Sequence, residues 1–174
     1  TDLDAWDPHS PQAPEVVPFG AGIPDRTRQL VDFIRLNDAQ GLKDLFARQG
    51  EQMACVLLEP IIGNAGSIAA TPEWLQLLRE VCSQYGTMLI IDEVKTGFRV
   101  ARGGAQSLYG IYGDLTTYAK AMGNGYPVAA FGGRAEVMDK VGAFKGGVVH
   151  GGPWSGPFRR HPGCKGAPEL TNNG

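Results

Sequence analysis

The amino-acid sequence predicts an α/β protein in which a mostly parallel β-sheet is flanked by helices. Three observations lead to this prediction. Short, continuous apolar runs have the profile of buried strands. Segments with apolar residues at three- and four-residue spacing, typical of helices, alternate with these runs. Capping residues, glycines and prolines stand at the junctions between the two kinds of segment.

The chain is expected to have three parts. Residues 1–30 contain five prolines and no apolar periodicity, which indicates an irregular, extended arm. Residues 31–145 carry the alternating pattern and form the α/β core. Residues 146–174 are rich in glycine and proline and have little apolar surface to bury, so an irregular tail is predicted there.

The first elements of the core fit more than one assignment. Residues 30–36 fit a short strand, and a helix fits them nearly as well. Either Asn37 or Asp38 can cap a helix that runs through Phe46 and stops near Gly50.

Strand and helix signals become clear in the middle of the chain. Residues 53–59 form a continuous apolar run, which predicts a strand buried on both faces. Thr71 followed by Pro72 is a strong helix start, because a capping hydroxyl precedes a proline at the first helical position. Gly86 is placed to end this helix, and residues 87–92 then predict a second buried strand.

The second half of the core continues the alternation. We expect a short helix near residues 104–110, strands near 114–119 and 127–132, and a last short helix over 135–141. Consecutive strands separated by helices favour parallel pairing, which is the basis of the fold class given above.

Composition argues against several classes of protein. The 174 residues suffice for one domain with a buried core, and a net charge of −2 argues against nucleic acid as a partner. We recognise no membrane-spanning run and no signal peptide, so a cytoplasmic protein without membrane contact is expected. The three cysteines lack the spacing of a disulfide framework or a zinc site, and no metal site is expected. Cys55 and Cys82 lie in apolar stretches and are predicted to be buried thiols.

Polar residues follow the strands at the ends where ligands bind in open α/β sheets. Glu59 precedes a glycine-rich turn at residues 63–66, Asp92 and Glu93 end the next strand, and Lys120 follows the third. Because the carboxyl ends of parallel strands lie at one edge of the sheet, we expect a carboxylate, an amide and an amine to meet there.

Lys120 is the candidate nucleophile of this edge. It stands between Ala119 and Ala121, where small apolar neighbours predict partial removal from water, and an amine in such a place suits carbonyl chemistry. Lys95, three residues after Asp92, is the one serious rival. An amine and an aspartate at neighbouring strand ends suit pyridoxal phosphate, whose aldehyde a lysine binds and whose ring nitrogen an aspartate keeps protonated. Val94 would offer an apolar surface to the ring.

Two long motifs make the interpretation specific. The run LIIDEVKTGFR at 89–99, followed by DLTTYAKAMGNGYPVAAFGGR at 114–134, closely resembles the class III pyridoxal-phosphate aminotransferases. EPIIGNAG at 59–66 is similar to a turn of the same family. The resemblance covers residues 53–142 and is closest to the glutamate-1-semialdehyde aminomutase branch.

The resemblance implies a role for each matching residue. Lys120 is the lysine that forms the Schiff base and carries the proton, and Asp92 is the partner of the pyridinium nitrogen. Val94 packs against the ring, and Asn64 bonds the 3-hydroxyl group of the cofactor. The implied fold is part of the large domain of fold-type I enzymes, active as a homodimer with pyridoxal 5′-phosphate at the subunit boundary.

The chain also departs from the family pattern. A complete member is more than twice as long, so this chain is expected to be truncated. The family's Ser-Gly-Thr phosphate-binding turn and its ring-stacking aromatic residue have no counterpart here, and Pro153 stands where the family has a threonine. Candidates to hold the phosphate instead are the backbone N–H groups of residues 151–155, the Ser155 hydroxyl, and Arg159 of a partner chain.

The sequence therefore predicts an aminotransferase that moves an amino group between an amine or amino acid and a keto acid or aldehyde. One alternative is an aminomutase that acts on a single substrate. Another is a truncated remnant that folds and dimerises without turnover. A dinucleotide site at Gly123-Asn124-Gly125 is disfavoured, because Pro127 and a strand follow where a phosphate-binding helix should begin.

Overall fold

The computed structural model describes residues 21–141 and 147–148. The chain divides into two compact units, one ending at Arg134 and the other beginning at Ala135. The second unit contains the short helix α5 (Ala135–Met138) and an isolated bridge between Val141 and Val148. All other elements belong to the first unit.

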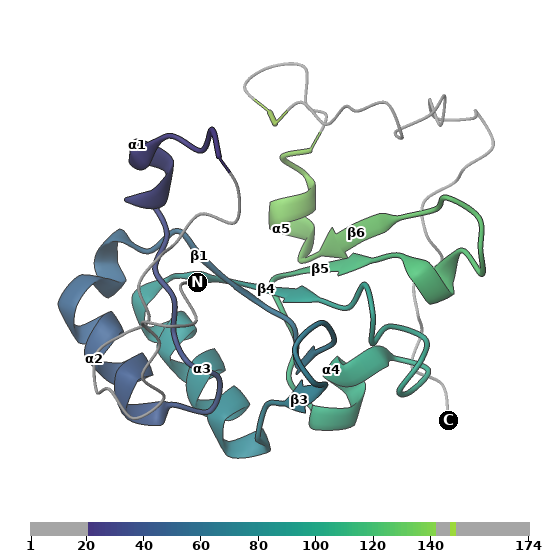
Figure 1. The fold of residues 1–174 in the computed structure, drawn as a ribbon, viewed down its shortest axis with the longest axis horizontal. Coiled ribbons are helices and arrows are strands. Elements are labelled where there is room, and N and C mark those ends of the chain that lie inside the picture. Colours follow the sequence, from purple (N-terminus) through teal and green to yellow (C-terminus); the bar gives the residue numbers. More distant parts are fainter. Residues whose placement is uncertain (1–20, 142–146, 149–174) are drawn as a thin grey trace. The chain divides into compact units, whose positions relative to one another are not determined.

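A four-stranded mixed sheet forms the centre of the first unit (Figure 1). Its order is β1 (Cys55–Leu58), β4 (Met88–Asp92), β5 (Leu115–Tyr118) and β6 (Ala130–Gly133). The first three strands are parallel, and β6 runs antiparallel to β5. The expected mostly parallel sheet with flanking helices is thus confirmed.

Three helices lie on one side of the sheet, as Figure 1 shows: α2 (Ala39–Gln49), α3 (Pro72–Tyr85) and α4 (Gly104–Tyr109). Their apolar faces and the sheet residues beneath them form the core, which includes Leu42, Phe46, Leu75, Leu78, Leu89 and Ile91. Each of these side chains is almost fully removed from water, and burial of such a side chain contributes about 1.5–3 kcal/mol.

Helix ends follow the local signals of the sequence. Asp38 caps α2 by accepting a hydrogen bond from the Gly41 N–H at 2.8 Å, which decides between the two predicted caps. Thr71 caps α3 in the same way, with its Oγ1 atom 3.3 Å from the Trp74 nitrogen. Gly86 ends α3 at φ +70°, a left-handed conformation that glycine adopts without steric cost.

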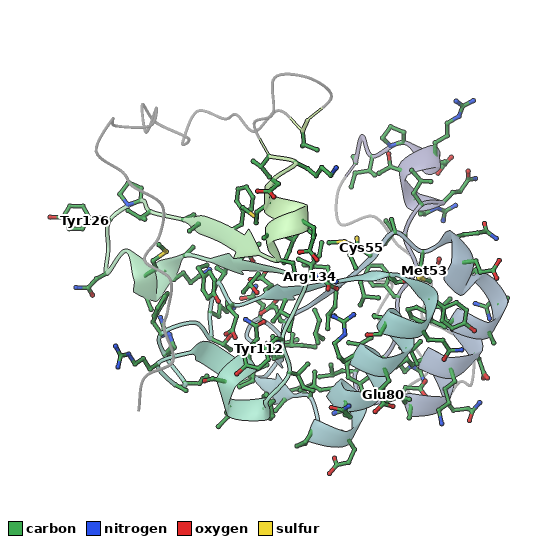
Figure 2. All side chains as sticks on the ribbon, turned by 180° about the vertical axis from the view of Figure 1, so that it is seen from behind. Met53, Cys55, Glu80, Tyr112, Tyr126 and Arg134 are labelled. Carbon is green, nitrogen blue, oxygen red and sulfur yellow. The ribbon has the colours of Figure 1, made fainter. Side chains whose placement is uncertain are left out.

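The strand β1 differs from the prediction in burial. It lies at the edge of the sheet, and Leu57 on the face opposite the core is 66% exposed. Cys55 is exposed on the same face, so its predicted burial is wrong. Figure 2 places Cys55 on the side of the sheet opposite α3, whose Glu80 points away from the sheet. The run was apolar throughout, but an edge strand buries only the face that the helices cover.

Cys82 is buried inside α3, as predicted. Burial raises the pKa of its thiol to about 11, so this thiol stays protonated at neutral pH.

Several short elements were not predicted. A hairpin of β2 (Ile61–Ile62) and β3 (Ile68–Ala69) follows β1, and a one-turn helix α1 (Asp25–Arg28) lies within the predicted arm. The short 3-10 helices η1 (Gly50–Gln52) and η2 (Lys120–Met122) complete the described elements. Residues 30–36 form neither the strand nor the helix that were considered for them.

Residues 1–20 and most of the predicted tail lie outside the described residues, so the three-part division of the chain remains a prediction. Within the described ranges, no helix is both long enough and apolar enough to cross a membrane.

Candidate functional site

Asp92 is the last residue of β4, and one of its carboxylate oxygens is held in place. Oδ1 accepts a hydrogen bond from the Val94 N–H at 2.8 Å and another from the Thr117 hydroxyl at 3.1 Å. Thr117 is the register partner of Asp92 on β5. Within the described part of the chain, both hydrogen bonds go to Oδ1 and none goes to Oδ2. The half-buried carboxylate therefore has a fixed orientation and one oxygen available to a ligand.

Lys120 follows the neighbouring strand at the same edge of the sheet. It is the first residue of η2, three positions beyond Thr117, and its φ of +47° lies in the left-handed region. A non-glycine residue adopts this conformation at a cost in energy, and such strain is concentrated at functional sites. Lys120 is exposed, so the predicted partial removal from water is not found among the described residues.

The turn between β2 and β3 supplies the amide. Glu59 accepts a hydrogen bond from the Gly63 N–H at 3.1 Å, which holds the start of this turn. The next residue, Asn64, accepts a hydrogen bond at Oδ1 from Nζ of Lys95. A side-chain bond thus joins the turn to the loop after β4. The amine of Lys95, the rival nucleophile, is the donor of this bond.

Val94 and Ser155 complete the set of predicted site residues. Val94 is half-buried, and its backbone N–H takes part in orienting Asp92. Ser155, the candidate for the phosphate, lies outside the described residues.

Glu93 is a residue whose role the sequence did not reveal. Its side chain is 0% exposed, and its carboxylate accepts hydrogen bonds from the N–H groups of Gln106 at 2.8 Å and Ala105 at 3.0 Å. The hydroxyl of Thr96 donates to the same carboxylate. These two amides belong to the first turn of α4, so Glu93 anchors that helix to the end of β4.

Gly104 makes room for the carboxylate of Glu93 at the start of α4. It has φ +70°, and a Cβ at this position would lie 2.5 Å from Oε1 of Glu93. Only glycine fits both the backbone conformation and the close approach of the carboxylate. The pair Gly103-Gly104 was visible in the sequence, but nothing there connected it to a glutamate eleven positions earlier.

Two ion pairs share the carboxylate of Asp114 at the opposite end of β5. Asp114 accepts hydrogen bonds from the Leu89 N–H at 2.7 Å, from Arg79 at 3.0 Å and from Arg134 at 3.1 Å. Burial alone would raise the pKa of this carboxyl. The hydrogen bonds and the Arg79 charge outweigh burial, and the pKa of Asp114 is lowered. Asp114 thus joins α3, β4 and the residue after β6, and it lies away from the candidate site.

Tyr118, the last residue of β5, packs against Phe98 with ring centroids 5.6 Å apart. Burial, and then the nearby charge of Glu93, raise the pKa of the Tyr118 hydroxyl. This phenol therefore remains neutral at physiological pH.

The site thus offers an oriented carboxylate, an exposed amine on a strained turn and an amide. Among the described residues, no group of three or more His, Cys, Asp or Glu side chains could hold a metal ion. The donor set suits an organic ligand with a basic ring nitrogen and a carbonyl group better than it suits a metal.

Known proteins match this chain in sequence and in fold. Residues 10–159 match the family model described as aminotransferase class-III. Glutamate-1-semialdehyde 2,1-aminomutase of Desulfatibacillum aliphaticivorans is 46% identical over 140 residues, which are 80% of this chain and 33% of that protein. The chain therefore spans about a third of the length of the curated relatives that it matches.

Solved transaminases have the same fold over this region. An omega-transaminase from Sphaerobacter thermophilus matches with a TM-score of 0.73 and 38% identity, over 78% of this chain and 31% of that chain. A transaminase with PLP bound matches with a TM-score of 0.71 and 34% identity, over 76% of this chain and 32% of that chain. These partial matches confirm the expected fold, part of the large domain of a fold-type I enzyme. The chain belongs to the class III aminotransferases.

Proposed function

We propose that this chain provides the cofactor-binding core of a pyridoxal-phosphate-dependent aminotransferase. The reaction moves an amino group between an amine or amino acid and a keto acid or aldehyde. The observation that carries the proposal is the pairing of Asp92 with Thr117 on the neighbouring strand. It fixes the carboxylate at the edge of the sheet where Lys120 lies, three residues after Thr117.

The residues at this edge fit pyridoxal 5′-phosphate by their chemistry. The bound cofactor supplies an aldehyde carbon and an aromatic ring that accepts electrons. Oδ2 of Asp92 is the oxygen available to a protonated ring nitrogen, because Oδ1 already accepts two hydrogen bonds. A carboxylate fixed before the reaction stabilises the positive ring without having to reorient.

The other residues have distinct tasks. Lys120 supplies the amine that holds the cofactor covalently, and once released it moves a proton at the substrate carbon. Asn64 hydrogen-bonds the 3-oxygen of the ring, and Val94 packs against a ring face. Ser155 contacts the phosphate.

The proposal extends to assembly and location. We propose a homodimer in the cytoplasm, with the cofactor at the subunit boundary, and small amines, amino acids and keto acids as substrates. The exposure of Lys120 supports a site that a second subunit covers.

One other function has specific support. The relative from Desulfatibacillum aliphaticivorans is a glutamate-1-semialdehyde 2,1-aminomutase, which favours an aminomutase acting on a single substrate. The remaining alternative is a remnant that folds and dimerises without turnover.

A spectrum and an activity assay distinguish these functions. With added pyridoxal phosphate, the aminotransferase and the aminomutase both predict a yellow protein whose absorbance is lost in Lys120→Ala. Amine-to-keto-acid transfer between two different substrates supports the aminotransferase, whereas isomerisation of one substrate alone supports the aminomutase. A protein that gains no visible absorbance with excess cofactor contradicts both and supports the remnant. Lys43→Ala, at an exposed position on α2, is the matched control.

A further inference from the structure

The amide of Asn64 is held by its oxygen. Nζ of Lys95 donates a hydrogen bond to Oδ1 of Asn64, although the two residues are 31 positions apart in the chain. A carboxamide has one acceptor oxygen and one NH2 group with two donors. Because a cation can bind only at the oxygen, Lys95 decides which end of the Asn64 amide is offered to a ligand.

Because Gly63 has no side chain, the Lys95 side chain can cross the turn at this position. A Cβ at position 63 would lie 2.9 Å from Nζ of Lys95 and closer still to its Cδ, nearer than such atoms approach in proteins. The Gly63 N–H is meanwhile held by Glu59 at 3.1 Å. The turn backbone and the lysine therefore fit each other, and the bond to Asn64 is part of the folded turn.

We propose that Lys95 is a positioning residue of the cofactor site, which fixes the Asn64 amide so that its NH2 group faces an anionic oxygen on an aromatic ring. This inference rests on the proposed function and deepens it, since it adds a residue that orients the amide already proposed to bond the ring. The oxygen that this amide faces is the ionised 3-oxygen of a 3-hydroxypyridine.

Charge supports the same assignment. The ammonium of Lys95 polarises the amide to which it donates and thereby strengthens Asn64 as a donor. Its positive charge also favours an anion beside the amide. Among the described residues, the other charged groups near the strand ends are Glu59, Asp92, Glu93 and Lys120. Since Lys95→Met leaves all four in place, it removes this one charge and this one hydrogen bond.

The first arm of the test needs no ligand. In nuclear magnetic resonance spectra of the full chain, the side-chain NH2 signals of Asn64 are identified by their loss in Asn64→Ser. Lys95→Met is expected to shift these signals and to accelerate their exchange with water, whereas Lys95→Arg retains the hydrogen bond and changes them little. Lys43→Met is the matched control, because it removes an exposed lysine on α2. Unchanged Asn64 signals in Lys95→Met overturn the inference.

The second arm uses 4-deoxypyridoxine 5′-phosphate, an analogue that has the 3-hydroxyl group but no aldehyde for Lys120. Its ultraviolet spectrum reports the pH at which the bound 3-hydroxyl loses its proton. In Lys95→Met this pH is expected to rise by about half to one pH unit relative to the wild type, from the loss of one nearby positive charge. Lys95→Arg and Lys43→Met are expected to match the wild type.

The two arms separate this inference from the proposed function. An analogue that binds with the same deprotonation pH in the wild type and in Lys95→Met overturns the role of Lys95 and leaves the proposed function standing. If Lys95→Met alters the Asn64 signals but no form of the protein binds the analogue, Lys95 does fix the amide. The proposed function then fails, and with it the assignment of the ring oxygen.

Discussion

The hydroxyl of Thr117 donates a hydrogen bond to Oδ1 of Asp92 at 3.1 Å, across two neighbouring parallel strands. A second bond, from the Val94 N–H at 2.8 Å, reaches the same oxygen. The carboxylate is thus oriented from β5 and from its own loop at once. Thr117 is not among the residues that the motif assigned to the cofactor, yet it decides where the free oxygen of Asp92 lies.

Thr117→Val removes this hydroxyl while keeping the shape of the side chain. We expect turnover to fall about tenfold and the free energy of unfolding to decrease by about 1.5 kcal/mol, since one hydrogen bond to a charged acceptor is lost. Steady-state kinetics and urea unfolding measure the two effects. Thr117→Ser retains the hydroxyl and should recover most of the activity. Equal activity in Thr117→Val and the wild type would contradict a positioning role for Thr117.

Asp92→Asn tests the carboxylate itself. Covalent attachment of the cofactor at Lys120 should persist, because the amine is untouched. Turnover should fall on the order of 10³-fold or more, because an amide does not keep a ring nitrogen protonated and a main electrostatic stabiliser is removed. Visible absorbance measures attachment, and the rate of amino transfer measures turnover. An unchanged rate would mean that the ring nitrogen is not the partner of Asp92.

Glu93→Ala tests the buried anchor of α4. The substitution leaves the Ala105 and Gln106 N–H groups and the Thr96 hydroxyl without their acceptor, and we expect a loss of about 3 kcal/mol in unfolding free energy. Glu80→Ala removes an exposed carboxylate from α3 and is the control, with an expected change within about 0.5 kcal/mol. Urea denaturation compares the stability of the two variants. Equal unfolding midpoints for both would contradict the role of Glu93 in anchoring α4.

Asp114 gives the fold a dependence on pH. Because its pKa is lowered in the folded state, the unfolded chain binds this proton more readily. Its stabilising contribution is therefore complete above the unfolded value of about 4 and is lost as the pH falls through the folded value. Unfolding free energies measured from pH 7 downward should decrease less steeply in Asp114→Asn than in the wild type. The exposed Asp44→Asn on α2 should follow the wild type, and parallel profiles in all three would contradict the assignment.

Local signals in the sequence predicted the elements that depend on local interactions. Thr71, Pro72 and Gly86 delimit α3 because a cap, a fixed φ and a left-handed glycine act within a few residues. The strand that carries Asp92 was predicted as well, since a continuous apolar run needs no partner to be recognised. The strand that precedes Lys120 was predicted from its place in the alternation of strands and helices.

Contacts between distant residues were beyond sequence reasoning. The bonds from Glu93 to backbone amides 12 and 13 positions away leave no side-chain pattern to read. The exposure of Leu57 depends on which face of the edge strand the helices cover, and the apolar run is the same in either case. Lys95 was weighed as a rival amine, whereas its bond to Asn64 became visible only when the turn and the loop were placed together.

The most direct test of the account is the site of covalent attachment of pyridoxal phosphate. The full chain is incubated with the cofactor, reduced with borohydride and digested, and the labelled peptide is identified by mass spectrometry. The account predicts one label, on Lys120, and its absence in Lys120→Ala. A label on Lys95, or no label at any lysine under saturating cofactor, would contradict it.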